Sequence, residues 1–270
     1  MKKFVKRILD QTGLLPTVER VYFNARAASL DVVRREIPLR QNGAPDGYPV
    51  PPADLIYDII GCRWAAVYLD SGRRLVNDLE QALTRNGYAL KDFGAILDFG
   101  CGCGRMLRHV LARTDANVYG TDYNPELAAW SAEHLAPATV KHNQLEPPLP
   151  FGDNSFDFAY ARSVLTHLPE DLQIRWMREL NRVLKPGGVL YFTTHGRALA
   201  RGLQHHQREA LERGEVVETF STRAGANLCS VYQYPAHVVR RLIDGYSLID
   251  FVEGRPRKHL RQDVYLLKAE

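Results

Sequence analysis

The residues best suited to chemistry lie in Ala95–Arg105, AILDFGCGCGR, where Asp98 is followed by glycines at positions 100, 102 and 104. An apolar run precedes Asp98, and Met106–Leu111 carries apolar residues at helical spacing, so the stretch predicts a strand, a glycine turn and a helix. Glycines let the backbone turn tightly and admit a ligand where a Cβ atom would block it. The free N–H groups that open the helix face the same cleft, and we expect a ligand to bind there.

The glycine spacing separates two classes of cofactor. Dinucleotide folds use G-x-G-x-x-G to seat a pyrophosphate, whereas this chain has D-x-G-x-G-x-G, with Asp98 two residues before the first glycine. An anion is badly placed beside a pyrophosphate and well placed beside the ammonium group of a methionine moiety. The pattern therefore disfavours an NAD(P) oxidoreductase. It resembles the first motif of the class I S-adenosylmethionine-dependent methyltransferases, and the resemblance is clear over Ala95–Gly196.

This resemblance implies S-adenosylmethionine as the cofactor and an α/β fold, with a doubly wound, mostly parallel seven-stranded sheet and an antiparallel C-terminal hairpin. From Ala95 onward apolar strand patterns alternate with helical ones, which independently favours a parallel sheet covered on both sides. Strands are expected at about Ala95–Leu97, Asn117–Thr121, Thr139–His142, Phe156–Ala161, Val189–Thr194, Ser247–Glu253 and Asp263–Lys268. Helices are expected at about Leu55–Leu69, Arg73–Asn86, Asp171–Leu184, Arg201–Arg213 and Ala236–Gly245.

The chain is expected to divide into a helical N-terminal extension or cap, residues 1–72, and a Rossmann-like methyltransferase domain, residues 73–270. The boundary is drawn where Ser71 is suited to cap a helix that begins at Arg73. Residues 196–235 depart from the tight alternation of strands and helices, and a connection of this length is typical of a lid or a substrate wall. We therefore expect residues 1–72 and 196–235 to form the walls of the acceptor site.

Polar residues at two strand ends are candidates for holding the adenosine part of the cofactor. Asp122 ends the second strand, where an acid accepts hydrogen bonds from both ribose hydroxyls; the alternatives are an ion pair with an arginine or a cap on the next helix. Asn143 ends the third strand, where an amide pairs with the edge of adenine, unless the residue belongs to a plain loop. The predicted cofactor-binding residues are Asp98, Gly100, Cys101, Gly102, Gly104, Asp122, Tyr123, Asn143 and Ser163.

Two histidines are candidates for a catalytic role. The run Arg162–Leu168 follows the fourth strand and resembles a segment common in bacterial methyltransferases, which places His167 near the transferable methyl group. A neutral imidazole there accepts the proton of an attacking hydroxyl or amine. The alternative is a structural histidine that holds backbone or lines the pocket. His195, after the fifth strand, is the second candidate for the base.

Composition and charge argue against several other classes of protein. The net charge of +4 over 270 residues does not by itself indicate a nucleic-acid partner, and no apolar stretch is long enough to span a bilayer. The first residues lack the apolar region of a secretory signal. Four cysteines do not make a disulfide framework in a chain of this length, so we expect a reduced, cytoplasmic setting.

Three further features each allow two interpretations. Cys101 and Cys103, with the other two cysteines, offer four thiolates to a metal, but both lie inside the cofactor turn and no C-x-x-C pair exists, so we expect no metal. Met1–Leu15 is either a helix that docks on its own protein or a basic amphipathic helix on an anionic membrane. Gly254–Gln262 is either a solvated basic hairpin tip or a phosphate contact.

The function predicted from these features is transfer of a methyl group to O or N of a small-molecule acceptor, such as a sugar or a secondary metabolite. An RNA methyltransferase is a second hypothesis, weakened because aromatic stacking residues are not interleaved with the basic ones. A non-catalytic subunit that binds the cofactor is a third. The sequence leaves the acceptor, the methylated atom and the oligomeric state open.

Overall fold

The computed structural model describes residues 44–220, 229–255 and 262–270, so the expectation for Met1–Leu15 lies outside the described residues. The helices are α3 Ala53–Ile60, α4 Ala65–Arg85, α5 Leu107–Leu111, α6 Pro125–His134, α7 Glu170–Val183, α8 Arg197–Ala200, α9 His205–Glu212 and α10 Pro235–Arg241, with 3-10 turns η1 Leu90–Asp92 and η2 Leu165–His167. The strands are β1 Ala95–Phe99, β2 Asn117–Asp122, β3 Thr139–His142, β4 Phe156–Ala161, β5 Leu184–Thr194, β6 Val217–Phe220, β7 Cys229–Tyr232, β8 Tyr246–Val252 and β9 Asp263–Ala269.

Seven strands form one sheet in the order β3-β2-β1-β4-β5-β9-β8, which confirms the predicted fold class. The strands from β3 to β5 pair in parallel, whereas β9 pairs antiparallel with both β5 and β8. The chain reverses its winding direction between β1 and β4. Ligands of doubly wound sheets bind at the carboxyl ends of the strands at such a point, and this edge carries the glycine turn.

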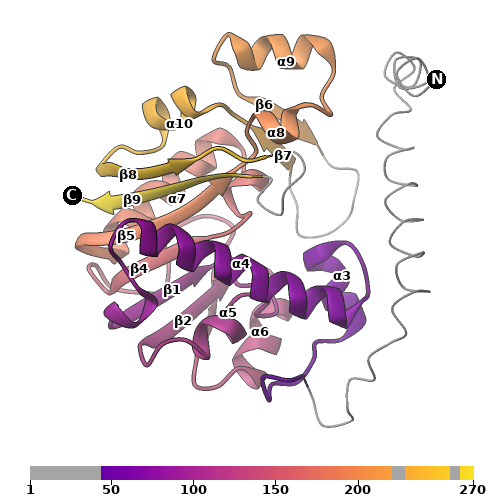
Figure 1. Cartoon of the computed structure of the whole chain (residues 1–270), viewed down its shortest axis with the longest axis vertical. Coiled ribbons are helices and arrows are strands. Elements are labelled where there is room, and N and C mark those ends of the chain that lie inside the picture. Colours follow the sequence, from indigo (N-terminus) through magenta and orange to yellow (C-terminus); the bar gives the residue numbers. More distant parts are fainter. Residues whose placement is uncertain (1–43, 221–228, 256–261) are drawn as a thin grey trace.

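Helices cover both faces of this sheet, as Figure 1 shows with α4 in front of the strands and α7 behind them. Trp176 and Leu180 of α7 pack with Val238 of α10 on one face. Leu79 of α4 and Leu107 of α5 pack on the other. Strand β4 lies at the centre and is buried on both sides, as its nearly continuous apolar sequence predicted.

The helices expected at Leu55–Leu69 and Arg73–Asn86 both differ from the structure. Helix α3 ends at Ile60, where Gly61 takes a left-handed backbone, and α4 begins at Ala65 and continues without a break past residue 72. Ser71 does not cap a helix; its hydroxyl donates to the Tyr68 carbonyl one turn back, at 2.9 Å. Gly72 lies inside the helix because a Cβ there would come within 2.0 Å of the Arg105 carbonyl oxygen. A boundary between cap and domain drawn at residue 72 therefore crosses one continuous helix that packs against the glycine turn.

Strand β5 also begins earlier than predicted. It starts at Leu184, and its pairing with β4 shifts register between Phe156 and Phe158, so the Lys185–Gly188 segment bulges within the strand instead of preceding it.

The insertion at 196–235 contains α8, α9 and the hairpin of β6 and β7, which forms a separate two-stranded sheet. In Figure 1 these elements lie at the opposite end of the view from α5 and α6. A small apolar cluster that includes Leu203, Leu211 and Tyr234 holds them together. The insertion reaches the main sheet through a bridge between His195 and Tyr232, so β7 lies against the carboxyl end of β5.

Candidate functional site

The turn between β1 and α5 has the left-handed backbone that its glycines permit. Gly100 and Gly104 both have a φ of +78°. A Cβ on Gly100 would lie 2.4 Å from Val164 Cγ2, and one on Gly104 would lie 1.9 Å from Leu135 Cδ1. Close contact and positive φ together exclude a side chain at these two positions.

Gly104→Ala is expected to lower the free energy of unfolding by about 1–3 kcal/mol, because it adds both backbone strain and a clash with the buried Leu135. Gly87→Ala is the matched control: Gly87 has a φ of +82° but nothing within 4 Å of an added Cβ. Urea unfolding measures the free energy of unfolding of both variants. An equal decrease in the two would show that Leu135 moves aside at no cost.

The Asp122 carboxylate supports the glycine turn from the end of β2. Its Oδ2 accepts from the Gly102 N–H at 2.8 Å, and its Oδ1 accepts from the Asn124 N–H at 2.9 Å. Asn124, not Asp122, caps α6, since its Oδ1 accepts from the N–H groups of Glu126 and Leu127. Burial raises the pKa of Asp122, and the two N–H donors act against that rise. Each carboxylate oxygen keeps a second lone pair for a further donor.

Asp98 lies near the end of β1, just before the glycine turn, and is buried. Burial raises its pKa to about 7; the negative charge of Asp122 adds to the rise, while Tyr160 and Arg105 oppose it. Two carboxylates therefore face one glycine turn, and the first of them is only half-ionised at neutral pH. A cationic group bound beside Asp98 would restore its charge.

Asn143 and Tyr123 lie beside the end of β2. The buried Asn143 side chain donates through Nδ2 to the Gln144 carbonyl at 2.7 Å, and its Oδ1 has no hydrogen-bond partner. The half-buried Tyr123 holds its carbonyl against His142 Nε2 at 3.0 Å. A buried acceptor without a partner costs free energy unless a ligand donor meets it, and the exocyclic amino group of adenine is such a donor. The residues around the turn therefore fit an adenosine-containing cofactor.

Ser163 opens the segment after β4 with a φ of +61°, which is unusual for a residue other than glycine. Its N–H donates to Thr193 Oγ1 at 3.0 Å, and its hydroxyl donates to Gln262 Oε1 at 2.9 Å. These contacts tie the carboxyl ends of β4 and β5 to the start of β9. Ser163 is therefore at the predicted sheet edge, with its hydroxyl engaged in the protein.

The structure brings the two candidate bases together, with 6.0 Å between the ring centroids of His167 and His195. His167 Nδ1 lies 3.0 Å from the Cys229 carbonyl oxygen on β7. Because a carbonyl oxygen only accepts, Nδ1 carries the proton and Nε2 keeps its lone pair. Burial lowers the pKa of His167, so the ring is neutral at pH 7.

His195 is more strongly affected by its surroundings. Burial lowers its pKa to about 3, and the charges of His167 and Arg162 add to the effect. Its buried Nδ1 has no hydrogen-bond partner. The ring stacks at a tilt against Tyr232 of β7, with 5.1 Å between centroids. The sequence did not predict that β7 would cover both histidines, because no motif marks that strand.

Two arginines at the same edge were also missed. Arg105 ends the glycine turn, and burial lowers its pKa to about 10, with the charge of Arg162 as the second cause. Arg162 precedes Ser163, and burial lowers its pKa as well. Both arginines could have been found in the sequence, because Arg105 directly follows the last glycine of the turn and Arg162 directly follows the fourth strand.

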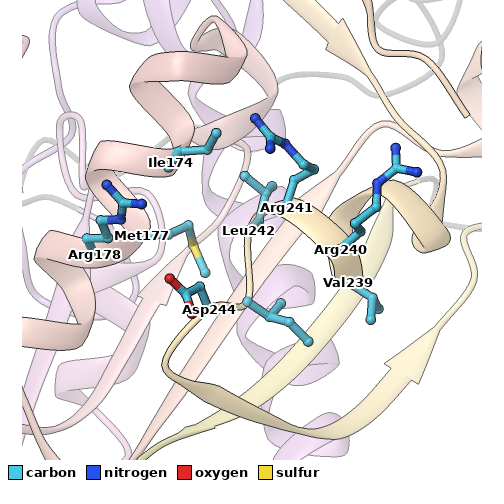
Figure 2. A pocket seen from close by; sticks show the side chains of 9 residues that line it. Ile174, Met177, Arg178, Val239, Arg240, Arg241, Leu242 and Asp244 are labelled. Carbon is cyan, nitrogen blue, oxygen red and sulfur yellow. The ribbon is translucent and has the colours of Figure 1, made fainter.

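A hollow of about 400 Å³ lies elsewhere, between α7 and α10, and shares no residue with the site described above. Figure 2 shows Arg178, Arg240 and Arg241 around it, near Met177 and Leu242. The glycine turn, not this hollow, carries the candidate site.

The described residues bear on the metal site, the basic loop and the membrane span that the sequence raised. Cys101 and Cys103 are buried in the turn, and within the described ranges no three His, Cys, Asp or Glu side chains are grouped to hold a metal. Most of the basic loop Gly254–Gln262 lies outside the described residues. Each helix in the described part of the chain is too short or too polar to span a bilayer.

Comparison with known proteins supports the interpretation of this site. Residues 97–192 match the family described as "Methyltransferase domain". A sterol 24-C-methyltransferase of Aspergillus fumigatus is 38% identical over 122 residues, which are 40% of this chain and 31% of that protein. Methyltransferase GfsG of Streptomyces halstedii is 30% identical over 187 residues, 64% of this chain and 62% of that protein. The chain thus spans less than two thirds of the length of either relative.

A solved structure supports the fold. The S-adenosylmethionine-dependent methyltransferase of Methanosarcina mazei superposes with a TM-score of 0.51 at 24% identity, covering 65% of this chain and 92% of that one. The matched residues 97–192 include the end of β1, the glycine turn, Asp122 and His167. Residues 97–192 therefore form a methyltransferase domain with the α/β fold of the class I S-adenosylmethionine-dependent methyltransferases, and its cofactor is S-adenosylmethionine.

Proposed function

We propose that the chain transfers a methyl group from S-adenosylmethionine to O or N of a small-molecule acceptor. The observation that carries this proposal is the position of His167: a neutral imidazole with an unprotonated Nε2 at the sheet edge that also holds the glycine turn. A neutral base at that place suits an acceptor that loses a proton as it is methylated. Hydroxyl and amine acceptors do so.

The cofactor would be held by residues from three strand ends. Asp98 would bind the ammonium group of the methionine moiety, and Asp122 the ribose hydroxyls. The unpartnered Oδ1 of Asn143 would accept from the adenine amino group, beside the Tyr123 ring. The assignments for adenosine use the unpartnered Oδ1 of Asn143 and the second lone pair of each Asp122 oxygen, whereas Cys101 and Ser163 would contribute through backbone position.

When bound, S-adenosylmethionine supplies a methyl group on a sulfonium, which is already an activated electrophile. The protein therefore has to orient the acceptor, exclude water and remove one proton. His167 Nε2 would accept that proton, while the Cys229 carbonyl keeps the ring in place through Nδ1. Strand β7 covers both histidines and would help to keep water from the reacting atoms.

The acceptor would be a small molecule enclosed by residues 44–72, the described part of the N-terminal extension, and by the insertion at 196–235, which we propose acts as a lid. Support comes from relatives whose names specify small acceptors. One is the ubiquinone biosynthesis O-methyltransferase of Xanthomonas campestris, which is 33% identical over 109 residues, 39% of this chain and 44% of that protein. The reduced cysteines of a cytoplasmic protein would fit the same assignment.

Tritium transfer from methyl-labelled S-adenosylmethionine into cell-extract metabolites tests this function. We expect a labelled compound of low molecular mass, which RNase treatment does not remove. Label in RNA would favour the RNA methyltransferase instead. Binding of S-adenosylhomocysteine without any transfer would favour the non-catalytic subunit, and calorimetry that detected binding of NAD alone would refute the cofactor assignment.

The affinity for S-adenosylhomocysteine is expected to rise about tenfold between pH 6 and pH 8. The pKa of Asp98 is about 7 without cofactor, and the ammonium group favours the ionised carboxylate, so binding at low pH must displace a proton. Calorimetry across this pH range measures the slope. Asp98→Asn should bind weakly with no slope, and a flat profile in the unchanged protein would remove Asp98 from the ammonium site.

A further inference from the structure

Arg162 follows β4 directly and connects the two halves of the candidate site. Its charge acts on Arg105, which ends the glycine turn, and on His195 at the end of β5. The cofactor half and the base half of the site therefore both lie within its electrostatic reach. Nothing in the roles proposed above uses the Arg162 side chain.

The guanidinium of Arg162 is fixed by one of its three nitrogens. Nη1 donates to Ser163 Oγ at 2.9 Å and to Thr193 Oγ1 at 3.2 Å. Both hydroxyls donate in turn to Gln262 Oε1, at 2.9 and 2.8 Å. This network sets the plane of the guanidinium and does not involve its opposite edge.

That opposite edge is made by Nε and Nη2. The buried Nε has no hydrogen-bond partner, and Nη2 makes no hydrogen bond with any residue in the described ranges. The negative charge of Asp78 on α4 and the Tyr191 hydroxyl on β5 act electrostatically on Arg162, but within the described ranges neither is hydrogen-bonded to its guanidinium. A buried charge without a hydrogen-bonded counter-charge is costly. The Nε–Nη2 edge is also the pair of parallel donors that a carboxylate binds with both oxygens.

We propose that the Nε–Nη2 edge of Arg162 binds a carboxylate group of the methyl acceptor. The inference rests on the proposed function and narrows it to acceptors that carry a carboxylate beside the methylated O or N. His195 lies within reach of the same charge, so the carboxylate would hold the acceptor next to the two imidazoles. The other carboxylate that can enter the site is that of the cofactor, and the experiment separates the two.

The first test changes the acceptor. A metabolite extract is divided, and the carboxylic acids of one half are converted to methyl esters with acidic methanol, a treatment that leaves phosphates in place. Label transfer from methyl-tritiated S-adenosylmethionine is expected to fall at least tenfold in the esterified half and to return after saponification. Equal label in both halves would overturn the carboxylate assignment while leaving the proposed function intact. No label in the untreated half would refute both.

The second test changes the protein. Arg162→Gln is expected to lower label transfer from untreated extract about tenfold and to leave the affinity for S-adenosylhomocysteine within twofold, which also shows that the variant folds. Arg162→Lys keeps the charge without the two parallel donors and should give an intermediate loss. Arg178→Gln, on the exposed side of α7, is the matched control with unchanged transfer. A tenfold loss of affinity for S-adenosylhomocysteine in Arg162→Gln, with none for 5′-methylthioadenosine, would assign Arg162 to the cofactor carboxylate and overturn the proposal.

Discussion

His167→Ala is expected to lower kcat for methyl transfer at least a hundredfold while leaving the affinity for S-adenosylhomocysteine within twofold. The reason is that His167 Nε2 is the unprotonated nitrogen that would take the acceptor proton, and general bases contribute about 10²–10⁴ in rate. Single-turnover transfer from labelled cofactor measures the first quantity, and calorimetry the second. His195→Ala should lower kcat by a smaller factor, since His195 lies beside His167 and would act only by shaping the surroundings of that ring.

A structural role for His167 has to be separated from a role as base, because Nδ1 also ties η2 to β7 through the Cys229 carbonyl. His167→Asn makes this separation. Its side-chain amide can donate to the same carbonyl from nearly the same place, but it has no nitrogen that accepts a proton. If the asparagine variant transfers methyl groups at the normal rate, His167 is a structural residue only.

The pH dependence gives a second readout for the base. Burial lowers the pKa of His167, so the imidazole stays neutral below the range in which an exposed histidine becomes protonated. The rate of transfer at saturating cofactor should therefore decline on acidification only at a lower pH than it would for a base with the ordinary pKa of histidine. A decline that remains in His167→Asn would have to come from another group.

Most of the fold could be predicted because local sequence specifies it. The apolar run Phe156–Ala161 is observed as β4 with the predicted bounds, and the antiparallel hairpin follows from the short connection between β8 and β9. The start of α4 was wrong for a reason that local sequence does not contain. Gly72 is small because the Arg105 carbonyl, 33 residues later, packs against it. A glycine that admits a distant backbone is indistinguishable in sequence from one that ends a helix.

The candidate site divides in the same way. Asp98 and Asp122 could be predicted to share a sheet edge because each lies at the carboxyl end of a strand, and the parallel pairing of β1 with β2 brings these ends together. The contact that holds the His167 ring could not be predicted, since Cys229 makes it with its backbone carbonyl, which any residue supplies. Nor could the unpartnered edge of Arg162 be predicted, because it depends on which guanidinium nitrogen donates to Thr193.

Asp122→Ala is expected to weaken the binding of S-adenosylhomocysteine tenfold to a hundredfold, about 1.5–3 kcal/mol, as for the loss of a charge-assisted contact with two hydroxyls. Calorimetry measures the change. Asp153→Ala is the control: this exposed carboxylate pairs with Arg182 at 2.6 Å on the surface and should leave the affinity unchanged. Unchanged affinity in Asp122→Ala would remove the residue from the cofactor site.

A loss of affinity alone does not prove a ribose contact, because Asp122 also accepts from the Gly102 N–H and so holds the glycine turn. The 2′-deoxy analogue of S-adenosylhomocysteine decides between the two causes. If Asp122 binds the ribose, removing the hydroxyl weakens binding to the unchanged protein about tenfold and has little further effect in Asp122→Ala, since the partner is already gone. If the residue only supports the turn, the two losses add. Additive losses would mean that groups other than Asp122 bind the ribose hydroxyls. Asp122 would then affect adenosine binding only through the conformation of the glycine turn.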